Sequence, residues 1–329
     1  GNMFTSTSGT SNFRAGVNAG NSIASGGNYN VAVGDEAGTA ITTGDQNVAI
    51  GYGAATALTT GANTVAIGYL AGDALTTGEN NVAIGKNALG AEDTHDFNIA
   101  IGSNALAVQN AGADAYNVAI GHNAGTAITT GTNNTLIGGR AGDALTDADF
   151  NVAVGNSALS ADTLGSTSIA IGHAALEAQN FTSATNTYNV AIGHVAGQSV
   201  TTGVQNTLIG ALAGDAISTG YDNVAVGYLA LSAATSGYDN VAVGGEALAA
   251  NTGINNTAVG HKSAYTNTTG TQNSALGTYS LFANTSGDFN TAVGYTALAA
   301  NTTADNNTAL GHQALNANTT GTAGTAVGK

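Results

Sequence analysis

The amino-acid sequence predicts an all-β fold, a parallel β-solenoid of about eighteen coils with 17 residues in most of them. Three observations predict it. The pentad Asn-Val-Ala-Ile-Gly and its variants recur along the chain, the closing glycines from Gly34 to Gly328 are almost all 17 residues apart, and each pentad has the alternation of a short strand. We expect one repeat domain over residues 28–329, preceded by an irregular cap or connector over residues 1–27.

Each repeat has two halves, and we expect a short strand in each. The pentad carries β-branched residues at two of its three central positions, which favours a strand. The second half, such as Ala71–Gly78, has regularly spaced alanines and a Thr-Thr-Gly corner. Helix is the rival interpretation, but a glycine in every turn disfavours it. Two short strands cannot bury their own apolar face, whereas identical stacked coils pair in parallel and in register. The degenerate pentad Asn12–Gly16 is a candidate atypical first coil.

Composition and charge limit the partners. The chain is 43% hydrophobic and 8% charged, which is typical of a folded chain with a thin, alanine-rich core. A net charge of −15 repels polyphosphates, so we expect no nucleic-acid partner. No apolar run approaches the length of a membrane span, and the absence of cysteine excludes disulfides.

An asparagine stands directly before most of the predicted strands. In a stacked fold this column predicts a ladder of side-chain hydrogen bonds, a structural role that identical residues in every coil suit better than catalysis. Its members are Asn30, Asn47, Asn81, Asn98, Asn117, Asn134, Asn151, Asn189, Asn206, Asn223, Asn240, Asn256, Asn273, Asn290 and Asn307. Thr64, Ser168 and Gly324 depart from the pattern.

The pentads also predict two buried faces. The position two before the closing glycine is almost always Ala, and the neighbouring position is always Val, Ile or Leu. Adjacent strand residues point to opposite sides, so one set fills the coil and the other requires a second cover. A homo-oligomer would supply that cover.

The pentads followed by alanine and a glycine-containing turn resemble the repeats of trimeric autotransporter adhesin heads. They are also similar to phage tail-fibre repeats, as in Asn256-Thr-Ala-Val-Gly260 and Asn290-Thr-Ala-Val-Gly294. The resemblance covers residues 28–329. It implies a left-handed β-roll, usually a homotrimer, that displays a binding surface or acts as a stiff spacer.

The residue after the pentad glycine is the best candidate for contact with a partner. This column holds tyrosines and histidines, whose rings suit sugar binding if they are exposed. They are Tyr52, Tyr69, His122, His173, His194, Tyr228 and Tyr295. His173 and His194 lie in consecutive coils, but two imidazoles without a carboxylate make a weak metal site, and we expect no metal. His261 and His312 stand in the same column.

Two other features of the turns have competing interpretations. The repeated Thr-Thr-Gly corners favour ice binding as a separate hypothesis, although β-branched residues are ordinary at solenoid edges. Scattered turn acids lack the dense Gly-Asp pattern of calcium-binding solenoids. No nucleophile elbow, paired-carboxylate motif or phosphate loop stands out, so we expect no enzyme and no cofactor.

A longer period of 72 residues, four coils, ends in each of two enlarged coils. Their extra residues fall at 109–116 and 179–188, where we expect surface bulges on one edge. The sequence as a whole predicts a structural, adhesive fibre module of a cell surface or virion that binds a receptor or surface glycan. An extracellular filament assembled end to end is the second hypothesis, since exposed edge coils invite stacking.

Overall fold

The computed structural model describes residues 3–4 and 7–329, which form two compact units. Unit 1 extends to Ser166 and includes Thr182–Thr185, and unit 2 comprises Thr167–Phe181 and Asn186–Lys329. The described residues form strands and turns and contain no helix. Accordingly, no helix in those residues is long and apolar enough to cross a membrane.

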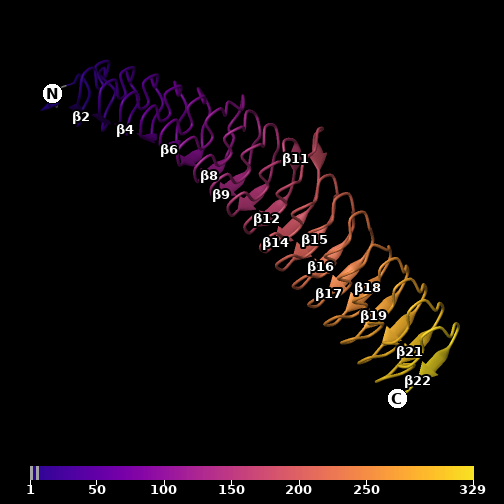
Figure 1. Ribbon diagram of the computed structural model, residues 1–329. Coiled ribbons are helices and arrows are strands. Elements are labelled where there is room, and N and C mark those ends of the chain that lie inside the picture. Colours follow the sequence, from indigo (N-terminus) through magenta and orange to yellow (C-terminus); the bar gives the residue numbers. More distant parts are fainter. Residues whose placement is uncertain (1–2, 5–6) are drawn as a thin grey trace. The chain divides into compact units, whose positions relative to one another are not determined.

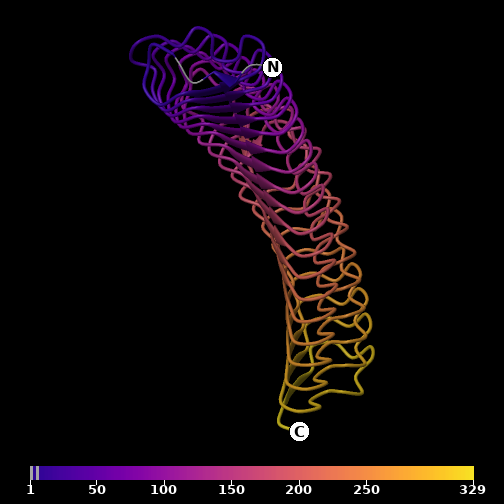
Figure 2. The same ribbon diagram turned by 90° about the vertical axis from the view of Figure 1, so that its left-hand side faces the viewer.

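Unit 1 is a stack of coils with one short strand in each (Figure 1). In its described residues nine strands follow one another in sequence order: β2 (Phe13–Ala15), β3 (Val31–Val33), β4 (Val48–Ile50), β5 (Val65–Ile67), β6 (Val82–Ile84), β7 (Ile99–Ile101), β8 (Val118–Ile120), β9 (Thr135–Ile137) and β10 (Val152–Val154). Each pairs with the next in parallel and in register. β1 (Met3–Phe4) lies antiparallel to β2. Figure 2 shows the strands of this unit stacked one above another.

Unit 2 repeats the arrangement. Its described part has ten coil strands: β12 (Ile169–Ile171), β14 (Val190–Ile192), β15 (Thr207–Ile209), β16 (Val224–Val226), β17 (Val241–Val243), β18 (Thr257–Val259), β19 (Ser274–Leu276), β20 (Thr291–Val293), β21 (Thr308–Leu310) and β22 (Thr325–Val327). Their pairing is parallel and in register throughout. Two further strands of two residues, β11 (Gly165–Ser166) and β13 (Thr185–Asn186), lie outside these series.

The predicted parallel β-solenoid is therefore confirmed for each unit, with nineteen coil strands in the described residues rather than about eighteen. The additional strand is β2, which belongs to the degenerate pentad Asn12–Gly16 and pairs in register with β3. Residues 1, 2, 5 and 6 of the predicted N-terminal segment lie outside the described residues. The handedness and trimeric state that the resemblance implies stay predictions.

The core of each coil is thin because small residues fill it. The middle residue of the strands, such as Ala49 or Ala66, is fully buried, while the residues on either side are half-buried and face outward. Leu136 is an exception to this alanine column, and it fits because Gly125 of the preceding coil and Gly142 of its own coil leave room for its methyl groups. The bulk of this side chain is thus matched by the absence of side chains at two facing positions.

The second strand predicted in each coil is not formed. The second half of the coil is a series of turns in which alternate residues, such as Leu70 and Gly72, adopt positive φ angles of 50° and 56°. The Leu70 N–H donates to Tyr52 of the preceding coil, and the Gly72 N–H donates to Ala88 of the following coil. In a strand, residues two apart bond to the same neighbour. Because alternate residues have a positive φ, the N–H groups of the turns donate both to the preceding and to the following coil. The turns are thus hydrogen-bonded to both neighbouring coils without a β conformation.

Candidate binding surface

The turn after each strand carries the side chains that the sequence singled out for binding. The pentad glycine adopts a φ near +130°, as at Gly51 (129°), and the next residue projects outward. All seven predicted residues of this column are exposed: Tyr52, Tyr69, His122, His173, His194, Tyr228 and Tyr295. This placement suits contact with a partner molecule.

The structure brings together only some of these rings. Tyr52 and Tyr69 of unit 1 are stacked, with ring centroids 5.6 Å apart. His173 and His194 of unit 2 are likewise stacked at 5.3 Å. Within the described residues, His122 and Tyr228 have no aromatic neighbour, because the next coil has Gly139 or Gly245 at the same position. Consecutive coils with rings at one position are needed for a continuous surface.

The largest group of rings lies in unit 2 and contains only one residue of the predicted set. We define the aromatic cluster as His261, Tyr265, Tyr279, Phe282, Tyr295 and His312. They stand one, two or five residues after pentad glycines. Tyr279 is at the centre, edge-on to His261 (5.6 Å between centroids), Phe282 (5.5 Å) and Tyr295 (6.4 Å). Tyr265 stacks on Phe282 at 5.5 Å, and Tyr295 stacks on His312 at the same distance.

Charged groups at the edge of the aromatic cluster balance one another. The Lys262 ammonium lies 5.2 Å from the centroid of the Tyr265 ring and 3.6 Å from a carboxylate oxygen of Glu246. The first contact is a cation–π arrangement and the second an ion pair. The positive charge of Lys262 is therefore offset locally by Glu246, and the net charge of the chain remains −15.

A second set of aromatic side chains, which the sequence analysis missed, stands at the corner before the strands. Phe97 stacks on Tyr116 at 5.1 Å in unit 1, and Tyr221 stacks on Tyr238 at 4.9 Å in unit 2. Tyr29, Phe150, Tyr188 and Phe289 are exposed at the same corner. The sequence signal was present, because these residues stand immediately before, or two before, the ladder asparagines.

The asparagine column forms a hydrogen-bonded ladder that is continuous from Asn81 to Asn151 in unit 1 and from Asn189 to Asn307 in unit 2. Asn223 is typical: its amide nitrogen donates to the Gly237 carbonyl at 2.8 Å, and its side-chain oxygen accepts the Asn240 N–H at 3.1 Å. Asn251, Asn267, Asn284, Asn301 and Asn318 form a second ladder at another corner of unit 2. The sequence analysis missed this ladder, although its spacing of 16 or 17 residues is visible.

The two hydroxyl groups of each Thr-Thr corner have different surroundings. The first Thr of a pair donates to a carbonyl of the following coil, as Thr42 does to Thr59 at 3.1 Å and Thr59 does to Thr76 at 2.9 Å. The second Thr, such as Thr43, is exposed. Half of the hydroxyl groups on which the ice-binding hypothesis depends therefore stabilise the main chain.

Carboxylates in the turns are mostly structural. Asp45 Oδ1 accepts the Asn28 N–H at 2.6 Å, and Asp288 accepts the Thr271 N–H at 2.6 Å, each from the preceding coil. Burial raises the pKa of Asp73 and of Asp215, against smaller opposing effects of backbone hydrogen bonds. The ionised forms of these two side chains are consequently less stable here than in water.

Both enlarged coils begin with a buried glutamine. Gln109 of unit 1 accepts a hydrogen bond from Asn117 at 3.1 Å, and Gln179 of unit 2 accepts one from Asn189 at 2.9 Å. The first insertion leaves the asparagine ladder intact, since the Asn117 N–H still donates to Asn98 at 3.3 Å. After the second insertion, the Asn189 N–H donates to Thr187 instead. Gly112, within the first insertion, has no atom within 4 Å of the place where a Cβ would lie.

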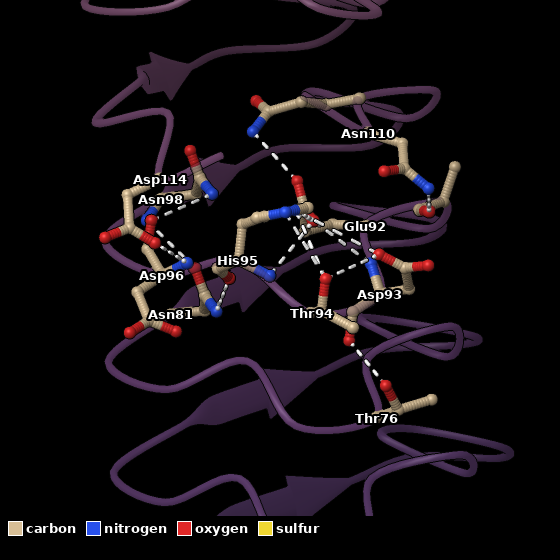
Figure 3. A network of polar contacts seen from close by, with 12 residues as sticks. Thr76, Asn81, Glu92, Asp93, Thr94, His95, Asp96, Asn98, Asn110 and Asp114 are labelled. Atoms are coloured by element: carbon tan, nitrogen blue, oxygen red, sulfur yellow. Dashed lines mark hydrogen bonds and ion pairs between the residues drawn. The ribbon is translucent and has the colours of Figure 1, made fainter. Parts of the chain in front are cut away.

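A separate polar network surrounds Glu92 of unit 1 (Figure 3). The carboxylate is fully buried, and its Oε1 lies 2.8 Å from His95 Nδ1. Its Oε2 accepts a hydrogen bond from the Gln109 amide at 3.2 Å. Within the residues that the structure describes, Glu92, Asp93 and His95 form a group whose potential ligand atoms all lie within 4.8 Å of one another.

No family model, curated protein or solved structure matches this chain.

Proposed function

We propose that this chain is a structural and adhesive module of a cell surface or virion, which binds a receptor or surface glycan through aromatic side chains on its turns. The aromatic cluster of unit 2 is the observation that carries this proposal. Six ring side chains gather over four consecutive coils, in a fold whose turns otherwise present mainly small residues. The resemblance to adhesin and tail-fibre repeats agrees with this function.

The chemistry of the aromatic cluster suits a ligand with both apolar and hydroxyl-bearing faces. The half-buried rings of Tyr265, Tyr279 and Phe282 provide apolar contact area, and the phenol groups and the exposed His261 and His312 provide hydrogen-bond partners. A sugar ring has such a pair of faces, because its C–H groups stack on aromatic rings while its hydroxyls bond at the edge. The net charge of −15 opposes acidic sugars, so the proposed ligand is a neutral glycan or a receptor that carries one.

Tyr295→Ala tests the proposed glycan site. We expect this change to weaken binding to neutral glycans on an array at least about tenfold, which corresponds to 1.4 kcal/mol. Tyr295 is 49% exposed, so its loss should leave folding intact. Tyr228→Ala is the matched control, because Tyr228 is 55% exposed in the same column but stands apart from the cluster. Equal losses in the two variants, or no binding by the unaltered chain, would contradict the proposal.

We also propose that copies of the chain associate side by side through the outward faces of the strands. Each strand presents two half-exposed residues outward, and in unit 1 these include Val48, Ile50, Val65 and Ile67. No outward position of β3–β10 or β14–β22 carries a charge. A long uncharged face of β-branched residues favours a partner with the same repeat. β1 already pairs with the edge of β2, which favours lateral association over the end-to-end filament.

Charges placed on the strand face of unit 1 test this association. Ile50→Lys with Ile84→Lys should convert an oligomer into monomers in sedimentation velocity, because lysines would be desolvated or opposed across the interface. Thr43→Lys with Thr77→Lys adds the same charge at exposed corners of the same unit and should leave the oligomer unchanged. If the unaltered chain sediments as a monomer at micromolar concentration, the strand face is not an interface between copies.

A further inference from the structure

Glu92 lies at an inward corner position that is apolar in most of unit 1. The equivalent residues Leu58, Leu75, Ile128 and Leu145 are fully buried, seven residues after their pentad glycines. Glu92 is equally buried. An ionised carboxylate in this position requires compensation, because burial of an unpaired charge is strongly unfavourable.

The same coil carries a second departure from the repeat, which places a ligand nitrogen against this carboxylate. His95 stands where the preceding coils have the corner glycines Gly61 and Gly78. Its Nδ1 lies 2.8 Å from Glu92 Oε1 and 4.0 Å from Asp93 Oδ1 (Figure 3). The His95 and Asp93 side chains are 18% and 46% exposed, so an ion can reach them from solvent.

From this geometry we propose that Glu92, Asp93 and His95 form a binding site for a divalent transition-metal ion such as Zn²⁺. Two carboxylate oxygens and one imidazole nitrogen are donors that Zn²⁺ accepts at about 2.0–2.2 Å. Tetrahedral ligands at those lengths are separated by about 3.4 Å, a value between the two distances that His95 Nδ1 makes with its neighbours. The metal takes the Nδ1 lone pair of the neutral imidazole, whose single proton is then on Nε2, and water completes the coordination.

The surroundings support a cation at this corner. Gln109 holds Glu92 Oε2 at 3.2 Å, which directs Oε1 toward His95, as outer hydrogen-bond partners orient metal ligands. Asp96 and Asp114 lie at the same corner, where Asp114 Oδ1 accepts the Asp96 N–H at 3.1 Å, and they add negative charge.

A second acidic coil in unit 1 shows that the histidine is what distinguishes the proposed site. Asp162 occupies the same inward position as Glu92, seven residues after Gly155. Its corner residue is Gly165, whose N–H donates to Asp162 Oδ1 at 3.0 Å. An inward acid therefore occurs in this fold without an imidazole at the corner residue, so its presence alone does not account for the histidine at residue 95.

Zinc titration of the full-length chain tests the proposal. His173→Gln with His194→Gln serves as the background protein, which removes the stacked histidine pair as a competing ligand. After dialysis against EDTA, isothermal titration with ZnCl₂ should show a single Zn²⁺ per chain. Addition of His95→Gln should weaken that binding by more than the roughly 10–100-fold typical for loss of an outer partner. His122→Gln, in the same background, should leave it unchanged.

The outcomes separate clearly. Absence of zinc binding in the background protein, or a loss on His95→Gln of no more than about 100-fold, the range of an outer partner, would overturn the proposal. X-ray absorption should report one nitrogen ligand in the background protein and oxygen ligands only after His95→Gln. If His95→Gln fails to fold by circular dichroism, Asp93→Asn replaces it, because Asp93 is 46% exposed, and the same thresholds apply.

Discussion

Gly244→Ala is expected to destabilise unit 2 by more than about 4 kcal/mol, and loss of soluble protein is an equally consistent result. Gly244 has a φ of 133°, a region that costs other residues about 1–3 kcal/mol. An added Cβ would also lie 2.6 Å from both the carbonyl carbon and the carbonyl oxygen of Gly260. These atoms belong to the backbone of the next coil, so relief requires separation of the coils and loss of their hydrogen bonds. Chemical denaturation of purified protein measures the effect.

The adjacent residue provides the control. Gly245→Ala changes the free energy of unfolding by less than about 1 kcal/mol, because its added Cβ would meet only a ring carbon of His261 at 3.6 Å, an ordinary contact. Similar denaturation midpoints for Gly244→Ala and Gly245→Ala would contradict the prediction, because they would show that the close spacing of the coils does not require the pentad glycine.

Asn223→Ala is expected to destabilise unit 2 by about 2 to 6 kcal/mol, since two buried backbone groups each lose a partner. The Asn240 N–H loses its acceptor and the Gly237 carbonyl loses its donor, as the ladder geometry dictates. Hydrogen exchange of the Asn240 backbone amide should accelerate in the same variant, because that N–H no longer has a hydrogen-bond acceptor.

Two companion variants make this prediction specific. The stability of Asn223→Thr should fall between that of the natural chain and that of Asn223→Ala. Thr64 already occupies the equivalent place in unit 1, where its hydroxyl donates to the Gly78 carbonyl over a longer distance of 3.5 Å. Thr219→Ala, at an exposed corner of unit 2, should change stability by no more than about 0.5 kcal/mol. Unchanged exchange at Asn240 in Asn223→Ala would mean that the ladder contributes little to coil cohesion.

The sequence was sufficient to predict the strands and their register. The 17-residue spacing places Val48 opposite Val65 and Ile50 opposite Ile67, which is the pairing observed. Register is predictable here because a shift by one residue would expose the buried alanines and bury the β-branched neighbours. Even the shorter spacing before Gly260 leaves β17 and β18 in register, because the missing residue falls in a turn.

The conformation of the second half was not predictable from residue types. Leu70 and Tyr279 adopt positive φ angles that isolated residues disfavour. They do so because hydrogen bonds to coils on both sides fix the main chain. This tertiary requirement overrides local preference, so the strand predicted from the regularly spaced alanines and the Thr-Thr-Gly corner was wrong.

The candidate sites were only partly visible for a related reason. The predicted column is the position directly after the pentad glycine, and it contains Tyr295. Tyr279 stands two residues after its pentad glycine, and Tyr265 and Phe282 stand five residues after theirs, so their rings belong to other columns of the repeat. The link between Glu92 and His95 was missed because each departs from a different column of the repeat. Departures that coincide in one coil were the available signal.

The turns bond to both neighbouring coils through main-chain atoms, and this has an evolutionary consequence. Leu70 and Gly72 engage adjacent coils through N–H groups that any residue except proline possesses, and the chain contains no proline. Side chains that project from these turns can therefore drift during evolution at little cost to cohesion. In the proposed adhesive role, selection could move the contact residues from one coil to another by point substitution.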